Sequence, residues 1–278
     1  MLPLLLALAW PGVSLATPSI AVTIKPLQLI AAAVTEGVAM PDVVWAQGQD
    51  PHHVSLRPSE RRLLGSADLV LWTGPMLERP LANLVNDLDA PVITVQELRG
   101  LTLIDVDGQP DPHVWVDTGN ARTIAAALAS SLAELDPANA TRYESNRAKF
   151  EMELDALDAE LQRDFAGREQ APWSVYHHAL RYLERALGLQ APVTLADSEN
   201  NAPGLRTAVR VREQLRQQDI TCMLAEPGVN HDEVQTMLGL RDFRIVDADV
   251  MNNADAPHYV SYMRALTTTL RNCLGPAR

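Results

Sequence analysis

Short apolar runs rich in β-branched residues alternate along this chain with longer segments whose apolar residues recur every three to four positions. The first pattern predicts buried strands and the second predicts amphipathic helices. The predicted strands are 20–24, 42–45, 68–72, 91–95, 173–176, 193–196, 220–225 and 244–248. The predicted helices are 27–38, 58–66, 76–86, 178–187, 204–217, 232–238 and 257–273. This alternation predicts an α/β protein with two lobes, each a parallel sheet covered by helices.

A single long helix is predicted between the two lobes. Asp136-Pro137 is a helix-start signal, with proline at the first helical position. The apolar residues that follow lie on one helical face: Tyr143, Phe150, Leu154, Leu157, Leu161 and Phe165. At 1.5 Å per residue, a helix over 137–165 would be about 43 Å long. We therefore expect an N-terminal lobe over 17–135, a rigid connecting helix over 136–168 and a C-terminal lobe over 169–278; a surface helix packed on one lobe is the alternative.

The N-terminal segment has the pattern of a cleaved signal peptide. Residues 2–15 are almost wholly apolar, and Ser14 and Ala16 stand at −3 and −1 of a possible cut, although no Lys or Arg precedes the run. We expect residues 1–16 to be removed on export to the periplasm; a buried N-terminal helix is the alternative. No other stretch has the roughly 18 apolar residues of a membrane helix, so direct membrane insertion of the mature chain is not expected.

The charge balance excludes one class of partner. The 278 residues include 23 basic and 35 acidic side chains, a net charge of −12. Binding to nucleic acid requires clustered Lys and Arg, and the chain has no such cluster. The 14 glycines form neither a dinucleotide-binding nor a phosphate-binding loop motif. We expect no nucleic-acid partner.

Cys222 and Cys273 are the two cysteines of the chain. In an oxidising compartment they permit one intramolecular disulfide, and the loop of about 50 residues would make it worth about 3–4.5 kcal/mol. Two separate buried thiols are the alternative. Neither cysteine belongs to a CxxC or CxxH pair, which makes both poor zinc ligands.

Three of the seven histidines stand where a strand or loop ends and a helix begins: His52, His113 and His177. In α/β folds ligands bind at such strand ends. His52 and His113 both complete the tripeptide Asp-Pro-His, whose proline restricts the backbone before the imidazole. Neutral imidazole is a good ligand for zinc, copper, nickel or iron, and a carboxylate oxygen commonly completes a four-coordinate zinc shell. Asp247, at the end of the last predicted strand, is the candidate fourth ligand.

The remaining candidates have simpler interpretations. His53 and His178 each follow a proposed ligand and would replace it only if the register were shifted by one. His231 and His258 are expected on the surface. Glu226 is equally well explained as an acceptor that orients a ligand imidazole or as a loop carboxylate. Trp115 and Tyr182 are expected to pack in the core.

Several segments together resemble a known family. They are VTIKPLQLIAAAV, DPHHVSLRPS, ADLVLWTGPMLE, DPHVWVD with Asn120, DPANATRYESN, VYHHALRYLE and CMLAEP. In this order they are similar to the ZnuA-like periplasmic zinc-binding solute-binding proteins of ABC importers. The resemblance implies two lobes joined by a rigid helix, one zinc ion per chain in the cleft between them, and delivery to a membrane permease. It also implies the ligands His52, His113, His177 and Asp247, and the disulfide Cys222–Cys273.

Two departures from the family pattern affect the site. The segment 103–110, where zinc members often have a His-rich loop, is short and contains no histidine. The segment VDADVMN lacks the Pro-Leu-Gly that usually follows the acidic ligand, so Asp249 or a water molecule competes with Asp247 for the fourth position.

The third ligand position, His177 in this chain, distinguishes zinc-binding from manganese-binding members of the family. Zinc members resemble this chain in having a histidine at that position, whereas manganese members have a carboxylate there. Three imidazoles favour zinc over the harder manganese ion. We therefore expect a monomeric zinc-import protein without enzymatic activity. A manganese or iron importer, a zinc chaperone and a zinc hydrolase are the alternatives, the last disfavoured because the chain has no HExxH or GxSxG motif.

Overall fold

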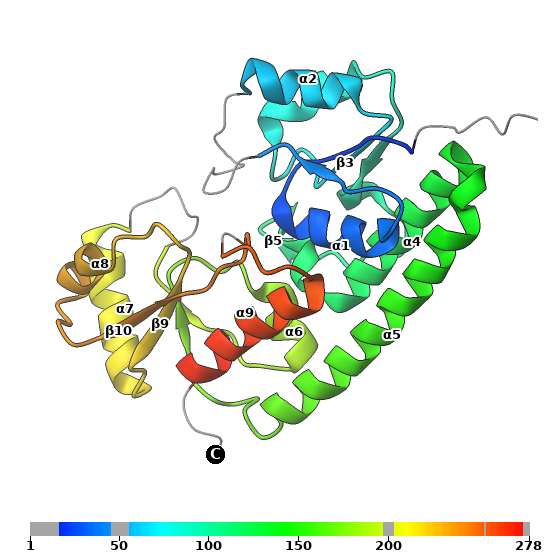
Figure 1. The fold of residues 1–278 in the computed structure, drawn as a ribbon. Coiled ribbons are helices and arrows are strands. Elements are labelled where there is room, and N and C mark those ends of the chain that lie inside the picture. The colour runs from blue at the N-terminus through cyan, green and yellow to red at the C-terminus, as the bar shows by residue number, and fades with distance from the viewer. Residues whose placement is uncertain (1–16, 46–55, 197–202, 253, 275–278) are drawn as a thin grey trace, which may run out of the picture.

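The computed structural model describes residues 17–45, 56–196, 203–252 and 254–274, and it has two α/β lobes connected by a long helix (Figure 1). The predicted signal peptide lies outside the described residues. The predicted fold class is confirmed by the two parallel sheets and by the connecting helix. Within the described ranges, no helix is both long enough and apolar enough to cross a bilayer.

The N-terminal lobe is built on a parallel sheet with the strand order β2-β1-β3-β4. Its strands are β1 (Ile20–Val22), β2 (Asp42–Val43), β3 (Leu69–Trp72) and β4 (Val92–Thr94). The helices that follow them are α1 (Lys25–Thr35), α2 (Pro58–Ser66), η1 (Arg79–Leu81), α3 (Ala82–Asn86) and η2 (Val95–Glu97). Every residue of β1 and β3 is buried, which explains why both strands are continuous apolar runs.

The C-terminal lobe repeats this plan with the strand order β10-β9-β7-β8, again parallel. Its strands are β7 (Ser174–Val175), β8 (Val193–Thr194), β9 (Cys222–Ala225) and β10 (Arg244–Asp247). Its helices are α6 (Arg181–Leu187), α7 (Leu205–Gln217), α8 (His231–Leu238) and α9 (Tyr259–Cys273). The expected disulfide is present and joins Cys222 of β9 to Cys273 of α9.

The predicted connecting helix is confirmed, with a short 3-10 turn at its start. The turn η4 (Pro137–Asn139) leads into α5 (Ala140–Phe165), a helix of 26 residues. All six apolar residues of the predicted face are buried. The helix packs against α1 and α4 (Thr118–Leu135) of the first lobe and against α6 and α9 of the second, so packing on one lobe alone is excluded (Figure 1).

The segment 96–135, to which the sequence pattern assigned no element, contains a hairpin and a long helix. The hairpin pairs β5 (Asp105–Val106) with β6 (Gln109–Pro110). It is followed by η3 (Val114–Val116) and by α4 (Thr118–Leu135), whose first turn is capped by the side chain of Asp117. This segment brings His113 to the lobe boundary.

Two predicted helices differ from the observed ones. Residues 76–86 do not form one helix. A turn closed by bonds to the Gly74 carbonyl extends to Glu78, the 3-10 helix η1 starts at Arg79 with Pro80 in its first turn, and α3 follows directly from Ala82. The helix predicted to begin at residue 178 begins at Arg181. The turn that precedes it, closed by the bond from Ala179 N to the His177 carbonyl, leaves both histidines outside the helix.

The two lobes share one apolar core. Buried residues of the first lobe, of α5 and of the inner face of the second lobe form a single contact cluster. A second, smaller cluster fills the outer face of the second sheet. Polar contacts also cross the boundary, because Trp115 Nε1 donates to the Val250 carbonyl at 3.0 Å and Tyr259 Oη donates to the Trp115 carbonyl at 2.6 Å. The lobes are therefore packed together as well as connected.

Candidate metal site

Two of the predicted ligands, one from each lobe, face each other. His113 precedes η3 in the first lobe, and His177 follows strand β7 of the second. Their ring centres are 5.5 Å apart. Two imidazoles on one tetrahedral zinc, with Zn–N distances of about 2.0–2.1 Å, would have ring centres about 5 Å apart. The observed spacing suits a shared metal ion.

His113 is held by a buried carboxylate from its own motif. Asp111 Oδ1 accepts hydrogen bonds from His113 N and from His113 Nδ1, both at 2.9 Å. Burial opposes ionisation of Asp111, but the charge of His113, its hydrogen bonds and the charge of Arg181 outweigh burial and lower the pKa of Asp111 from 3.8 to about 2. An ionised carboxylate only accepts, so Nδ1 carries a proton, and when the ring is neutral its lone pair is on Nε2.

His177 has the same kind of partner in the second lobe. Its Nδ1 lies 3.1 Å from Oε1 of Glu226, which follows strand β9. This contact favours the interpretation of Glu226 as an acceptor that orients an imidazole, the arrangement common around metal-bound histidines. The other oxygen of Glu226, Oε2, is buried and has no hydrogen-bond partner among the described residues.

Asp247 is at the end of β10, where the sequence predicts it, but its contact is with another histidine. Its Oδ1 lies 2.9 Å from Nε2 of His231, and the Asp247 side chain is 52% exposed. His231 is thus a partly exposed contact of Asp247. The rival ligand Asp249 accepts from Ala254 N through Oδ2 at 2.6 Å. Each of these hydrogen bonds occupies one carboxylate oxygen, so neither bond by itself prevents the aspartate from binding a metal through its other oxygen.

The remaining predicted ligand, His52, and its neighbour His53 lie outside the described residues. Within the described ranges, no three His, Cys, Asp or Glu side chains form a ready metal shell. The structure brings together His113 and His177, and the complete ligand set stays a prediction.

His178 points to a different partner from His177. It is buried, its Nε2 lies 2.5 Å from Glu184 Oε2, and its ring packs edge-on against Trp173. Burial lowers the pKa of His178, against the hydrogen bond to Glu184. Through its contact with Glu184, His178 helps to hold α6 in position. His258, at the start of α9, is exposed as expected.

A buried glutamate that the sequence analysis missed connects strand ends of the first lobe. Glu78 accepts from Thr23 Oγ1 at 3.0 Å, Trp45 Nε1 at 2.8 Å and Thr73 N at 2.8 Å. Burial raises the pKa of Glu78, against these hydrogen bonds. Its donors follow β1, β2 and β3, so Glu78 fixes the sheet edge that leads into the segment containing His52. A glutamate directly after a strand and turn was the available signal.

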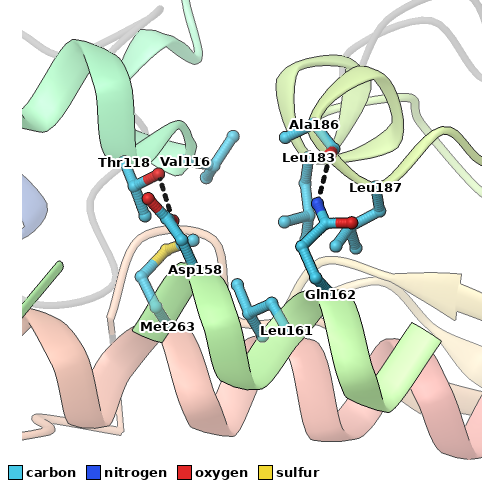
Figure 2. Close-up of a pocket in the computed structure, with 9 residues that line it drawn as sticks. All are labelled: Val116, Thr118, Asp158, Leu161, Gln162, Leu183, Ala186, Leu187 and Met263. Atoms are coloured by element: carbon cyan, nitrogen blue, oxygen red, sulfur yellow. Dashed lines mark hydrogen bonds between the residues drawn. The ribbon is translucent and has the colours of Figure 1, made fainter. Parts of the chain in front are cut away.

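A separate cavity of about 240 Å³ lies where the connecting helix meets both lobes (Figure 2). It is lined by Val116, Thr118, Asp158, Leu161, Gln162, Leu183, Ala186, Leu187 and Met263. Thr118 Oγ1 donates to Asp158 Oδ1 at 2.6 Å, and Gln162 Nε2 donates to the Ala186 carbonyl at 3.1 Å, so both polar side chains on α5 are engaged. Neither His113 nor His177 lines this cavity, which is distinct from the candidate metal site.

Two α/β lobes on a helical connection, with an imidazole from each lobe at their boundary, define a metal-binding protein of the solute-binding class. The chain belongs to the ZnuA family, the periplasmic component A of zinc-uptake complexes, whose family model matches residues 20–273. The resemblance found in the sequence is thereby confirmed.

The relatives agree with this membership, and the solved structures agree with the fold. The chain is 28% identical to the high-affinity zinc uptake system protein ZnuA of Brucella abortus, over 92% of this chain and 91% of the relative. The chain is 26% identical to ZnuA of Yersinia pestis, over 94% of this chain and 92% of the relative. A crystal structure of ZnuA superposes with a TM-score of 0.83 at 21% identity, covering 92% of this chain and 99% of the other. The AdcAII protein of Streptococcus pneumoniae gives a TM-score of 0.81 at 19% identity, with 92% and 98% covered.

Proposed function

We propose that this protein binds one zinc ion per chain in the periplasm, at the boundary between its lobes, and delivers the ion to the permease of an ABC importer. The observation that carries the proposal is the pair His113 and His177, which come from opposite lobes with ring centres 5.5 Å apart. A carboxylate lies against Nδ1 of each ring. Membership of the zinc-uptake family and the names of the relatives support the choice of zinc.

The proposed shell consists of His113, His177 and His52, with Asp247 in the fourth position and Asp249 or water as its rivals. Three neutral imidazoles favour zinc over the harder manganese ion. A filled shell of four protein ligands has no open position for an activated water, so the proposed activity is binding and release without turnover. The mature protein is proposed to act as a monomer after removal of residues 1–16.

Metal analysis of purified protein tests this proposal. Protein isolated from the periplasm without added metal should contain about one zinc per chain by mass spectrometry. Replacing His113 or His177 by Ala should weaken zinc binding by more than the roughly 10–100-fold that loss of an outer-shell partner costs, because a ligand itself is removed. His258→Ser is the matched control, since it removes an exposed histidine and leaves a residue that can cap α9.

The outcomes separate the alternatives. Zinc that is lost in both ligand variants and kept in the control supports the proposal. Manganese or iron in the wild type, or no metal at all, would contradict the choice of ion. Separate Asp247→Ala and Asp249→Ala variants identify the fourth ligand as the one whose loss weakens binding, and unchanged binding in both would assign the position to water.

A further inference from the structure

Arg181, the first residue of α6, connects the segments that carry the two facing histidines. Its Nη1 donates to Asp111 Oδ2 at 3.1 Å, across the lobe boundary, and to the His178 carbonyl at 2.6 Å. The first acceptor belongs to the residue that holds His113, and the second belongs to the residue next to His177. One guanidinium nitrogen therefore bridges the two lobes beside the candidate metal site.

The carboxylate that Arg181 contacts is almost completely removed from solvent. The Asp111 side chain is 2% exposed, and that of Arg181 is 25% exposed. Burying a carboxylate is costly unless its charge is balanced and its oxygens are hydrogen-bonded. Oδ1 is used by His113, so Arg181 on Oδ2 is the cation that balances this charge. The result is a continuous series of contacts from Arg181 through Asp111 to the His113 ring.

The backbone on both sides of this series is fixed by the residue that follows Arg181. Tyr182 Oη donates to the Asp111 carbonyl at 2.8 Å and accepts from Ile104 N at 3.2 Å. Tyr182 thus fixes the backbone at residues 104 and 111, whereas Arg181 contacts the side chain of Asp111. The orientation of this carboxylate determines where Oδ1 meets Nδ1 of His113.

We propose that Arg181 is a positioning residue of the metal site, which orients His113 through Asp111 and couples that imidazole to the segment carrying His177. This inference rests on the proposed function, because it takes His113 and His177 as zinc ligands. Arg181 does not itself bind the metal. It restricts the two ligands of opposite lobes to one relative arrangement before the ion arrives, which reduces the entropy lost on binding.

The test compares Arg181→Ala, Arg181→Lys and the control Arg185→Ala in zinc titrations with a competing chelator. Arg185 is one turn further along α6 and lines the same 440 Å³ surface hollow as Arg181, but its side chain makes no hydrogen bond or ion pair within the described residues. Arg181→Ala should weaken zinc binding about tenfold, at the lower end of the effect of outer-shell partners. Arg181→Lys keeps the positive charge and should recover part of the loss, whereas Arg185→Ala should stay within about twofold of the wild type.

A double-mutant cycle with Asp111→Ala shows whether the effect passes through this carboxylate. If it does, adding Arg181→Ala to Asp111→Ala changes zinc affinity little, whereas independent effects would multiply. A second readout needs no metal: long-range ¹H–¹⁵N spectra of the zinc-free protein should show His113 as a single tautomer in the wild type and as a mixture in Arg181→Ala.

The outcomes separate this inference from the proposed function. Zinc binding that depends on His113 and His177 but is unchanged in Arg181→Ala would overturn the inference and leave the function standing. Multiplicative effects in the cycle, or an equal loss in Arg185→Ala, would also overturn it. A wild type that binds no zinc while His113 still changes tautomer in Arg181→Ala would refute the function and retain the contact series. Thermal unfolding of each variant separates weaker binding from weaker folding, and Arg181→Lys provides the comparison if Arg181→Ala does not fold.

Discussion

At the scale of single residues, Asp68 shows how one exposed carboxylate fixes the first strand. Its Oδ2 accepts hydrogen bonds from Ser19 N and Ser19 Oγ, both at 2.8 Å. Both hydrogen bonds lower the pKa of Asp68 below its ordinary value of 3.8, and the bond from the Ser19 backbone has the larger effect. Ser19 and Asp68 directly precede strands β1 and β3, so this contact joins the starts of two neighbouring strands.

The lowered pKa gives a pH-dependent prediction. Above pH 3.8 Asp68 is ionised in both the folded and the unfolded protein, and its hydrogen bonds to Ser19 stabilise the folded state. This stabilisation is lost as the pH falls through the lowered pKa of Asp68 in the folded state. Asp68→Asn should therefore be less stable than the wild type at pH 7, by no more than about 1 kcal/mol because solvent screens the pair. Urea unfolding at pH 7, 5 and 3 should show the difference shrinking at the lowest pH. Asp89→Asn, at another exposed carboxylate of the same lobe, is the control; an Asp68 effect that is equal at all three pH values would contradict the prediction.

The sequence could identify residues with local signals and not those defined by distant partners. His113 and His177 were predicted because each stands where a strand or loop leads into a helix, and the fold brings them together. Arg181 contacts Asp111 across 70 residues, a pairing that no local pattern encodes. Glu226 was left open for the same reason, since its partner His177 is 49 residues away.

At the scale of elements, α5 depends on apolar burial more than on its charges. Arg122 of α4 reaches Asp155 and Asp158 at 2.8 Å, and Arg264 of α9 reaches Glu160 at 2.8 Å. Such partly exposed ion pairs are each worth about 0–1 kcal/mol. The buried face of the helix, which includes Leu154 and Leu157, provides the larger contribution to stability.

Replacing one leucine of this face should show the difference. Leu157 is completely buried, and Leu157→Ala should lower the free energy of unfolding by about 2–5 kcal/mol, because it leaves a cavity in the shared core. Met152 is on the same helix with 66% of its surface exposed, and Met152→Ala should change stability by less than about 0.5 kcal/mol. Denaturant unfolding of the two variants gives the comparison. A loss below about 1 kcal/mol in Leu157→Ala would mean that the shared core does not depend on α5.

A helix whose large apolar residues lie on one distinct face could be predicted from the sequence. A helix whose small apolar residues lie on all sides could not. The face of α5 consists of large residues at regular spacing among charged ones. In α4 alanines occupy buried and exposed positions alike, and the stripe of Ile124, Leu128 and Leu132 is correspondingly less visible. The aspartate cap at Asp117 was the signal that could have located its start.

At the scale of the whole molecule, the two lobes are held in one arrangement by several independent connections. They share a core along α5, and the segment 111–117 is bonded to residues of α6, α9 and the loop after β10. Lys25 of the first lobe also pairs with Asp255 of the second at 2.8 Å. A wide hinge motion would have to break all of these contacts together.

We therefore expect zinc uptake and release to involve local movement beside the site and little change in overall shape. Small-angle scattering of the zinc-free and zinc-bound protein should give radii of gyration that agree within about 1 Å, as for complexes whose backbone moves little on binding. A His177→Ala sample treated with zinc controls for non-specific effects of the ion. A decrease of several ångströms in the wild type alone would indicate hinge closure instead.

The bonding of segment 111–117 also limits how this protein can be divided. By chain order the segment belongs to the first half, yet the phenol that holds Asp111 and the carbonyl that receives the Trp115 indole belong to the second. A fragment ending at residue 135 would lose these hydrogen-bond partners and would expose to water the apolar residues that pack against the second lobe. A chimera with one half from a relative would meet the same mismatch unless both sides were exchanged together. The smallest unit that can be transplanted as a folded module is the complete two-lobed body.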